Sequence, residues 1–331
     1  MGKATPITTN SLNSSTFGAV QTDSQAWHFI VNPAAGGGKA RQRWRTLLPK
    51  LQTAFPRMTF AVSTPATSLG ALAQDAVREG KHHLIGVGGD GTHHQILNGL
   101  MVTGMISKVV YAPLALGSGN DWARSLATPR KLDHWLDHFE SGSIQSQMIG
   151  HLTFPETGAE HYFLNVAGFA YDAEVVRIAA EERVRHQWMY PILALSYLSE
   201  YRPPTVCVSP KPGTRGSAQD IWEGDVHTIN VGVGRYSGGG MQFVPHADPF
   251  GHQLALTVAQ KLPRWKVMAN SWRFYAGSIG QVKGVRTSHL NSVHLQPTAG
   301  TLECEADGEW LGSGPVTVSV ARDRLRVLTA I

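Results

Sequence analysis

The sequence has few cysteines, no long hydrophobic run and no excess of acidic residues. Cys207 and Cys304 stand far apart among 331 residues, so we expect neither a disulfide framework nor a cysteine-based zinc site. The longest apolar run, 190–198, is interrupted by Pro191 and Ser196 and is far shorter than the roughly 20 residues that a membrane span requires. These absences favour a globular protein of a reduced compartment, the cytoplasm, without a transmembrane segment.

The N-terminus also lacks a recognisable targeting signal. It has no charged start followed by an apolar core, and Pro6 stands where a myristoylation signal needs Ser or Thr. Residues 1–25 are rich in Ser, Thr and Asn and predict a disordered tail. The net charge of +5 suits contact with anions such as nucleotides or acidic lipid surfaces, and no motif indicates a nucleic-acid partner.

Hydrophobic periodicity divides the rest of the chain into two parts. From 26 to 142, short apolar strands alternate with amphipathic helices, which predicts an open, mostly parallel α/β sheet covered on both faces. From 143 to 331, β-rich runs predominate and predict a second domain, with helical stretches at 173–201 and 263–277 and an exposed loop at 210–217. We leave open that the last strand returns to the first domain.

Three glycine-rich turns follow predicted strands of the first domain, at 32–38, 88–92 and 116–121. Glycine allows the backbone to approach a phosphate, and the helix N-terminus after each turn offers unpaired N–H groups. Because the carboxyl ends of parallel strands meet at one edge, we expect the turns to converge on a nucleotide site. Asp90 would repel a phosphate unless a divalent cation lay between them, so it favours a metal-bound nucleotide.

A series of motifs extends beyond these turns. In order along the chain stand NPAAGGGK at 32–39, GGDGT at 88–92, PLALGSGND at 113–121, NVAG at 165–168, GGGM at 238–241 and DGE at 307–309. Together they resemble the diacylglycerol kinase catalytic domain family, which includes sphingosine kinases and soluble bacterial lipid kinases. GGDGT alone is shared with NAD kinases and resembles a phosphofructokinase turn. The resemblance covers roughly residues 27–330 and implies a Rossmann-like domain followed by a C-terminal β-sandwich.

The resemblance implies transfer of the γ-phosphoryl group of ATP, with Mg²⁺, to a lipid hydroxyl in a cleft between the domains. The acceptor would be diacylglycerol, a sphingoid base, phosphatidylglycerol or a similar lipid at a membrane surface. By analogy, the nucleotide would be held by Asn32, Lys39, Arg43, Thr64, Gly88, Gly89, Asp90, Gly91, Thr92, Gly117, Ser118 and Asn120. Lys39 and Arg43 would neutralise phosphate charge, and Asp90 and Asp121 are the candidate metal ligands.

The acidic motif near the C-terminus supplies the candidate catalytic residues. The resemblance implies that Asp307 is the base for the attacking hydroxyl, with Glu309 positioning that base or the acceptor. In the sphingosine branch the base is the aspartate of GGDG, so Asp90 is the rival. Asp172 matches a position that meets the lipid headgroup. Without the family context, an Asp-Gly pair at 307–308 would indicate only a hairpin turn.

The family pattern is broken at three places. Gln95 stands where most members have glutamate, Gly251-His252 replaces an Asp-Gly pair that would support a structural Mg²⁺, and Ala170 replaces a glycine. These departures keep open a catalytically weak lipid-binding or regulatory relative, or a kinase for a non-lipid alcohol.

Basic and aromatic side chains are interleaved in two stretches of the second domain, 183–201 and 261–277. Such a mixture suits peripheral binding at a membrane interface, which would be the inner face for a cytoplasmic protein. The alternative is that the aromatic residues form ordinary core and the charges ordinary surface. The oligomeric state stays open, a homodimer included.

Overall fold

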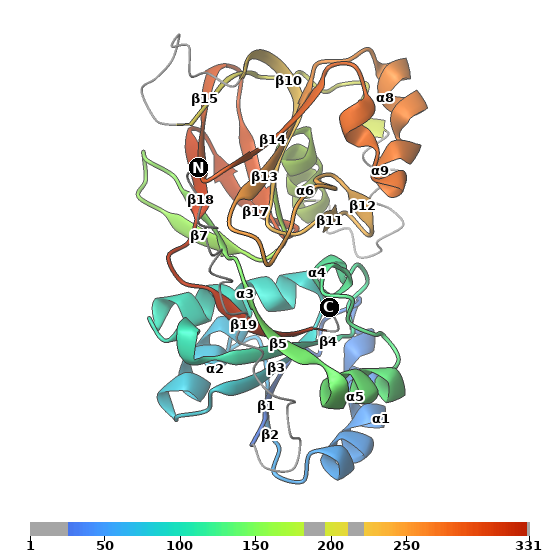
Figure 1. Cartoon of the computed structure of the whole chain (residues 1–331), viewed down its shortest axis with the longest axis vertical. Coiled ribbons are helices and arrows are strands. Elements are labelled where there is room, and N and C mark those ends of the chain that lie inside the picture. The colour runs from blue at the N-terminus through green and yellow to red at the C-terminus, as the bar shows by residue number, and fades with distance from the viewer. Residues whose placement is uncertain (1–25, 182–195, 211–221, 330–331) are drawn as a thin grey trace, which may run out of the picture.

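The computed structural model describes residues 26–181, 196–210 and 222–329. The tail predicted at 1–25, the middle of the helical stretch predicted at 173–201, and most of the loop predicted at 210–217 lie outside the described residues. Figure 1 shows two lobes stacked along the long axis of the molecule. A six-stranded sheet forms one lobe and an eleven-stranded sheet forms the other, which also carries a two-stranded ribbon.

The six-stranded sheet has the order β2-β1-β3-β4-β19-β5. Its strands are β1 (His28–Val31), β2 (Thr59–Val62), β3 (His83–Gly88), β4 (Val110–Ala115), β5 (Ser143–Gln147) and β19 (Leu325–Thr329). All neighbours pair in parallel except β19 and β5, which are antiparallel. The prediction of an open, mostly parallel sheet is therefore confirmed.

Helices cover both faces of this sheet. They are α1 (Lys39–Ala54), α2 (Leu69–Arg78), α3 (Asp90–Val102), α4 (Asp121–Ser125) and α5 (Leu132–Ser141). Successive side chains of a strand point to opposite faces, so Phe29 packs with Trp44 of α1 and Trp135 of α5, whereas Ile30 packs with the cluster of α2 and α3. The chain after β1 thus enters α1 on one face of the sheet, and the chain after β3 enters α3 on the opposite face. This topological switch point is where open α/β sheets bind ligands.

Two strands of the sheet come from beyond residue 142. β5 begins directly after the predicted boundary, and β19 near the end of the chain inserts between β4 and β5. The chain therefore crosses between the two lobes twice, after β5 and before β19. Both lobes share these connections near the site described below.

The second lobe is antiparallel. Its sheet has the order β17-β16-β8-β10-β9-β15-β18-β6-β7, and β13 joins β10 to β14. The strands are β6 (Gly150–Thr153), β7 (Glu160–Phe163), β8 (Val166–Ala170), β9 (Thr205–Ser209), β10 (Trp222–Gly232), β13 (Leu254–Gln260), β14 (Val285–Leu290), β15 (Ser292–Ala299), β16 (Glu303–Ala306), β17 (Glu309–Ser313) and β18 (Val316–Val320). The two short strands β11 (Tyr236–Ser237) and β12 (Met241–Gln242) form the ribbon.

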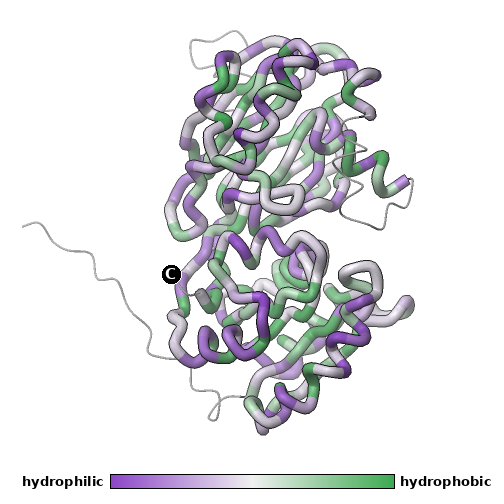
Figure 2. The backbone as a smooth tube through the Cα atoms, turned by 90° about the vertical axis from the view of Figure 1, so that its right-hand side faces the viewer, coloured by the Kyte–Doolittle hydropathy of each residue, from purple (hydrophilic) through white to green (hydrophobic). Residues whose placement is uncertain are grey.

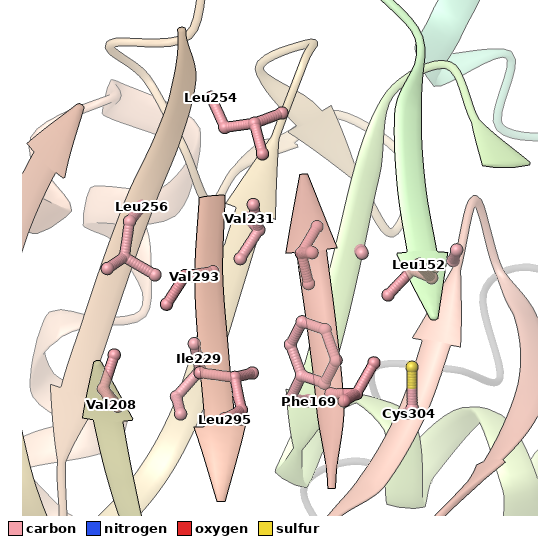
Figure 3. Packing of buried hydrophobic residues seen from close by; sticks show 14 of the residues in the cluster. Leu152, Phe169, Val208, Ile229, Val231, Leu254, Leu256, Val293, Leu295 and Cys304 are labelled. Atoms are coloured by element: carbon pink, nitrogen blue, oxygen red, sulfur yellow. The ribbon is translucent and has the colours of Figure 1, made fainter. Parts of the chain in front are cut away.

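The long strand β10 passes from one layer of the sandwich to the other. Its first residues pair with β9 and its last residues pair with β8 and β13. Figure 3 shows Phe169, Ile229 and Leu295 packed between the layers, with Cys304 beside them. Cys304 and Cys207 are both buried free thiols, consistent with a chain without a disulfide framework.

The second lobe also carries the helices α6 (Tyr171–Glu181), α8 (Arg264–Asn270) and α9 (Trp272–Ala276). Figure 2 shows hydrophobic and hydrophilic segments alternating through both lobes, as expected when each has its own core. Among the described residues, no helix is long and apolar enough to cross a membrane.

Candidate active site

The three glycine turns of the first domain touch one another through their backbones. A Cβ atom added to Gly36 would lie 3.0 Å from the carbonyl oxygen of Leu116, and one added to Gly117 would lie 2.4 Å from Cα of Gly89. Gly36 also has a positive φ of 60°. Larger residues would force the turns apart, so the predicted convergence rests on the absence of side chains.

Side chains then connect the first two turns. Asn32 Nδ2 donates a hydrogen bond of 2.9 Å to Thr92 Oγ1, which also accepts from the N–H of Gly89 at 3.2 Å. A Cβ atom on Gly88 would lie 2.1 Å from the same oxygen. Asn32, Gly88 and Thr92 therefore fix the first two glycine turns relative to each other.

Asp90 links α3 to α4. Its Oδ1 accepts a hydrogen bond of 3.0 Å from the N–H of Trp122 in the first turn of α4, where the helix dipole favours a carboxylate. Burial raises the pKa of Asp90 to about 6, and the neighbouring carboxylates Asp121 and Asp307 act in the same direction. Asp90 thus lies among acidic groups and also positions the third glycine turn.

Asp121 reaches across to the second domain. Its Oδ2 accepts a hydrogen bond of 2.6 Å from the N–H of Gly239, and burial raises the pKa of its carboxyl group. Its Oδ1 is buried without a hydrogen-bond partner and lies 3.7 Å from the guanidinium of Arg124. Within the described part of the chain, no three His, Cys, Asp or Glu side chains form a metal cage.

A basic groove of about 770 Å³ opens beside the first and third turns. It is lined by Gly36 and by several of the predicted nucleotide residues, namely Lys39, Arg43, Gly117, Ser118 and Asn120. Asn120 has a positive φ of 55°, and its side chain exchanges two hydrogen bonds with the backbone of Gly117. The sequence reading missed Arg130, which lines this groove and donates to the carbonyl of Gly119 at 2.8 Å.

Thr64 follows β2 at the same edge of the sheet. Its Oγ1 accepts a hydrogen bond of 3.3 Å from the N–H of Ala66, and its backbone pairs with Thr67. Its side chain is thus engaged within its own turn.

The DGE motif forms the turn between β16 and β17 and faces the glycine turns. The Asp307 carboxylate accepts N–H groups from Leu164 and Asn165 at 2.9 Å and from Val166 at 3.3 Å, and its side chain is 4% exposed. Nδ1 of His94, in the first turns of α3, lies 3.5 Å from Oδ2 of Asp307. Asp307 is therefore anchored at the joint between the two domains.

Glu309 meets the second glycine turn directly. A Cβ atom on Gly91 would lie 2.3 Å from Oε1 of Glu309. Glu309 is half-buried and lines a groove of about 640 Å³ together with His94, Asn98 and Trp310. Burial raises the pKa of its carboxyl group, with Asp307 adding to the effect. The acidic hairpin and GGDGT thus form one site across the two domains.

Two further carboxyl groups lie buried behind the hairpin. Asp172 accepts hydrogen bonds from Thr228 Oγ1 at 2.5 Å and Asn230 Nδ2 at 2.9 Å, and burial raises its pKa to about 6. Glu305, which the sequence reading missed, accepts the N–H of Gly308 at 2.8 Å, and burial raises its pKa to about 8. Its position in the short strand β16, beside a second glutamate, gave no signal of a functional role.

The three departures from the family pattern have different structural settings. Gln95 is exposed on α3 and lines the groove beside Glu309. Ala170 adopts a positive φ of 68°, so it keeps a backbone conformation that favours glycine at a cost of about 1–2 kcal/mol.

The third departure, at Gly251-His252, lies against a guanidinium group. Arg324 donates to the carbonyl oxygens of Phe250 at 3.2 Å, Gly251 at 2.9 Å and Ser146 at 2.8 Å. The guanidinium group of Arg324 therefore already supplies a positive charge to this loop. These residues do not fit a structural Mg²⁺ at the same place.

Comparison with known proteins agrees with this architecture. Residues 26–152 match the family model of the diacylglycerol kinase catalytic domain, and residues 165–329 match that of the YegS C-terminal NAD kinase beta sandwich-like domain. The diacylglycerol kinase of Mycobacterium tuberculosis (strain H37Rv) is 27% identical over 310 residues, which cover 90% of this chain and 93% of that protein.

The YtlR protein of Bacillus subtilis (strain 168) is 24% identical over 317 residues, covering 92% of this chain and 99% of that protein. A crystal structure of a diacylglycerol kinase from Bacillus anthracis (strain Sterne) superposes with a TM-score of 0.65 at 19% identity, covering 92% of this chain and 96% of that one. This likeness shows a shared fold. With both family models matched in order, the chain belongs to the diacylglycerol kinase catalytic domain family of lipid kinases.

Proposed function

We propose that the protein is an ATP-dependent lipid kinase that transfers the γ-phosphoryl group to a hydroxyl of diacylglycerol or a related lipid. The observation that carries this proposal is the contact between Gly91 of GGDGT and Glu309 of the acidic hairpin. It brings a phosphate-binding turn and a carboxylate on different domains to the two sides of one site. Phosphoryl transfer needs this pairing of positioned phosphate and acceptor.

The topological switch point between β1 and β3 supports a nucleotide at the glycine turns. The turns after both strands open helices, whose first N–H groups favour phosphate oxygens. Lys39, Arg43 and Arg130 line the adjoining groove and would balance part of the triphosphate charge. Glycine at 36, 89 and 117 lets the three turns pack closely against one another at this edge of the sheet.

Asp90 and Asp121 would hold Mg²⁺ together with the phosphates. Mg²⁺ is usually bound in such enzymes by one or two carboxylates plus substrate phosphates, so a cage of three protein ligands is not required. The fit is supported by Oδ1 of Asp121, a buried oxygen without a hydrogen-bond partner, and by the mutual repulsion of the two carboxylates. When bound, Mg²⁺ would neutralise charge on the transferring phosphoryl group.

Between the two hairpin carboxylates, the geometry favours Glu309 as the base. Asp307 is buried and already accepts three backbone N–H groups, whereas Glu309 faces the groove and has a raised pKa. A base with a pKa closer to the working pH accepts a hydroxyl proton more readily. We infer that Asp307 positions the hairpin. Only the family resemblance favours contact of Asp172 with the lipid, since its carboxylate is bonded to Thr228 and Asn230.

The test is phosphoryl transfer from labelled ATP with Mg²⁺ to a panel of diacylglycerol, sphingosine, phosphatidylglycerol and glycerol, with products identified by mass. Glu309→Gln is expected to lower kcat by roughly a hundredfold or more with the folded state intact. Asp307→Asn is expected to lower both activity and thermal stability, because it weakens the acceptor of three N–H groups. Glu140→Gln, an exposed change on α5, is the control.

A catalytically weak lipid-binding relative is the second candidate, favoured by the neutral Gln95 on α3. It predicts retention of lipid without transfer to any member of the panel. Full activity of Glu309→Gln, with transfer intact in the native protein, would instead contradict the proposed base.

A further inference from the structure

Two short helices of the second domain expose a stripe of large apolar side chains. The exposed fractions are 65% for Trp265, 53% for Met268, 57% for Trp272 and 58% for Tyr275. Ser271, which joins α8 to α9, has helical backbone angles of −60° and −33°. The spacing of three, four and three residues therefore places the four side chains along one side of a nearly continuous helical segment.

The opposite side of this segment is partly buried against the body of the domain. Val267 contacts the cluster that contains Tyr171 and Val175 of α6. Phe274 packs against Phe243, with ring centroids 4.6 Å apart. The helices are thus attached to the body of the protein, and their outward stripe is a feature of the folded domain.

The segment of sequence that carries the stripe has charge of one sign. Residues 249–302 contain no Asp or Glu and six Lys or Arg residues. Lys266 lies over the ring of Trp265 at 5.5 Å and Arg273 over that of Trp272 at 4.8 Å. Several cations of the segment also have partners within the protein: Lys261 bonds Asp225, Arg264 bonds the carbonyl of Ser199, and Arg273 bonds Asn270 and Gln281.

We propose that the stripe Trp265, Met268, Trp272 and Tyr275 docks the protein onto an anionic lipid bilayer. Tryptophan and tyrosine favour the interface between headgroups and acyl chains, and each nearby cation adds attraction to acidic lipids. The absence of acidic residues from the segment matches an anionic surface, so the charge argues for a bilayer over an acid-bearing protein surface of mixed sign.

This surface lies next to the candidate lipid site, and its purpose rests on the proposed lipid kinase function. Val267 of α8 packs against the cluster that contains Tyr171, which directly precedes the candidate substrate residue Asp172. On the other flank, Gln242 Nε2 of β12 donates to the carbonyl of Tyr275 at 3.3 Å. Figure 1 shows α8 and α9 on the same side of the sandwich, close to α6 and β12. Docking would therefore hold the site beside the membrane that contains its acceptor.

The experiment is cosedimentation of the full chain with large unilamellar vesicles, without nucleotide. Vesicles of phosphatidylcholine with one quarter phosphatidylglycerol are compared with phosphatidylcholine alone. The native protein is expected to bind the anionic vesicles preferentially. Lys266→Glu is expected to lower the partition coefficient about tenfold or more, and Trp265→Ala with Trp272→Ala by a similar factor. Phe60→Ala with Lys108→Glu, exposed changes on the first domain, is the matched control.

Failure of the native protein to bind anionic vesicles, or equal binding by the stripe variants, would overturn the docking surface. The docking surface would also be overturned if the native protein sediments as a dimer, the stripe variants lose that dimer, and vesicle binding is unchanged. A second copy of the chain would then be the occupant of the stripe. Transfer to a short-chain diacylglycerol in detergent micelles is measured in parallel. Vesicle binding without any transfer would overturn the kinase function alone, and transfer without vesicle binding would overturn docking alone.

Discussion

The two halves of the site are built in different ways. In the first domain, glycine turns approach one another through bare backbone, and Asn32 and Thr92 bond to each other behind them. In the second domain, buried carboxylates such as Asp172 and Glu305 are held by hydrogen bonds that offset part of the cost of burial. One half therefore depends on the absence of side chains, and the other on acidic side chains kept in an apolar environment.

This difference teaches where each half is vulnerable. The backbone half leaves no space for added side chains where its turns touch, at Gly36, Gly89 and Gly117. In the carboxylate half, neighbouring side chains fill the space around the acids. The stability of this half depends on protonation, because burial raises the pKa of Asp172 and Glu305. Hydrogen bonds join the halves, including a pair between Asn98 of α3 and the backbone of Tyr162 in β7.

The largest effect is expected from Gly117→Ala. The new Cβ atom would lie 2.4 Å from Cα of Gly89 and 2.8 Å from Oδ1 of Asn120, so the turns must separate. Misplacement of about 1 Å at a phosphoryl-transfer site costs on the order of a hundredfold in rate. The measurement is kcat with ATP and a lipid acceptor that the native protein phosphorylates.

Gly104→Ala is the control for this variant. Gly104 has a positive φ of 64° with nothing within 4 Å of an added Cβ atom, so its replacement costs about 1–2 kcal/mol of stability away from the site. It should keep its kcat. If Gly117→Ala and Gly104→Ala lost activity equally, the loss would be due to lower stability and not to separation of the glycine turns.

A smaller effect is expected from Arg324→Ala at the joint between the halves. Removal of the guanidinium leaves the carbonyls of Phe250, Gly251 and Ser146 without this donor, which should lower the free energy of unfolding by roughly 2 kcal/mol. Denaturant unfolding measures it, with the exposed neighbour Arg322→Ala as control.

Because Arg324 supplies the cation of that loop, a chelator should leave the melting temperature of the native protein unchanged in the absence of nucleotide. A chelator-induced fall in Tm would show that a metal ion, and not the guanidinium, stabilises the joint.

The smallest effect concerns the carboxylate half. The pKa of Glu305 rises from its ordinary 4.5 to about 8 on folding, so the unfolded chain ionises first and the stability of the native protein falls as the pH rises toward 8. Asp90 and Asp172, with pKa values of about 6, contribute mainly below that window. Glu305→Gln should remove roughly 1 kcal/mol of this decline between pH 6.5 and 8.

Unfolding free energies across this pH range measure the slope, and Glu140→Gln is the control. An unchanged slope in Glu305→Gln would mean that the carboxyl group of Glu305 is not protonated in the folded state near neutral pH.

The features that could be predicted from the sequence are local. GGDGT between an apolar run and a helix specifies a strand, a turn and a helix N-terminus within a few residues, and the structure places these elements as expected. Strand β17 and the buried acid Glu305 were missed, because a short strand with exposed Trp310 lacks a clear period and one of the two glutamates of the short strand β16 gives no local signal of burial.

The sequence by itself determined the two-domain organisation, the three glycine turns and the family, because periodicity and turn chemistry are set by neighbouring residues. Only the tertiary structure decided that Glu309 meets Gly91, that Arg324 fills the loop at Gly251, and that α8 and α9 present one exposed stripe. These contacts join segments far apart in the chain. They depend on how two separately formed cores pack together, which no short stretch of sequence encodes.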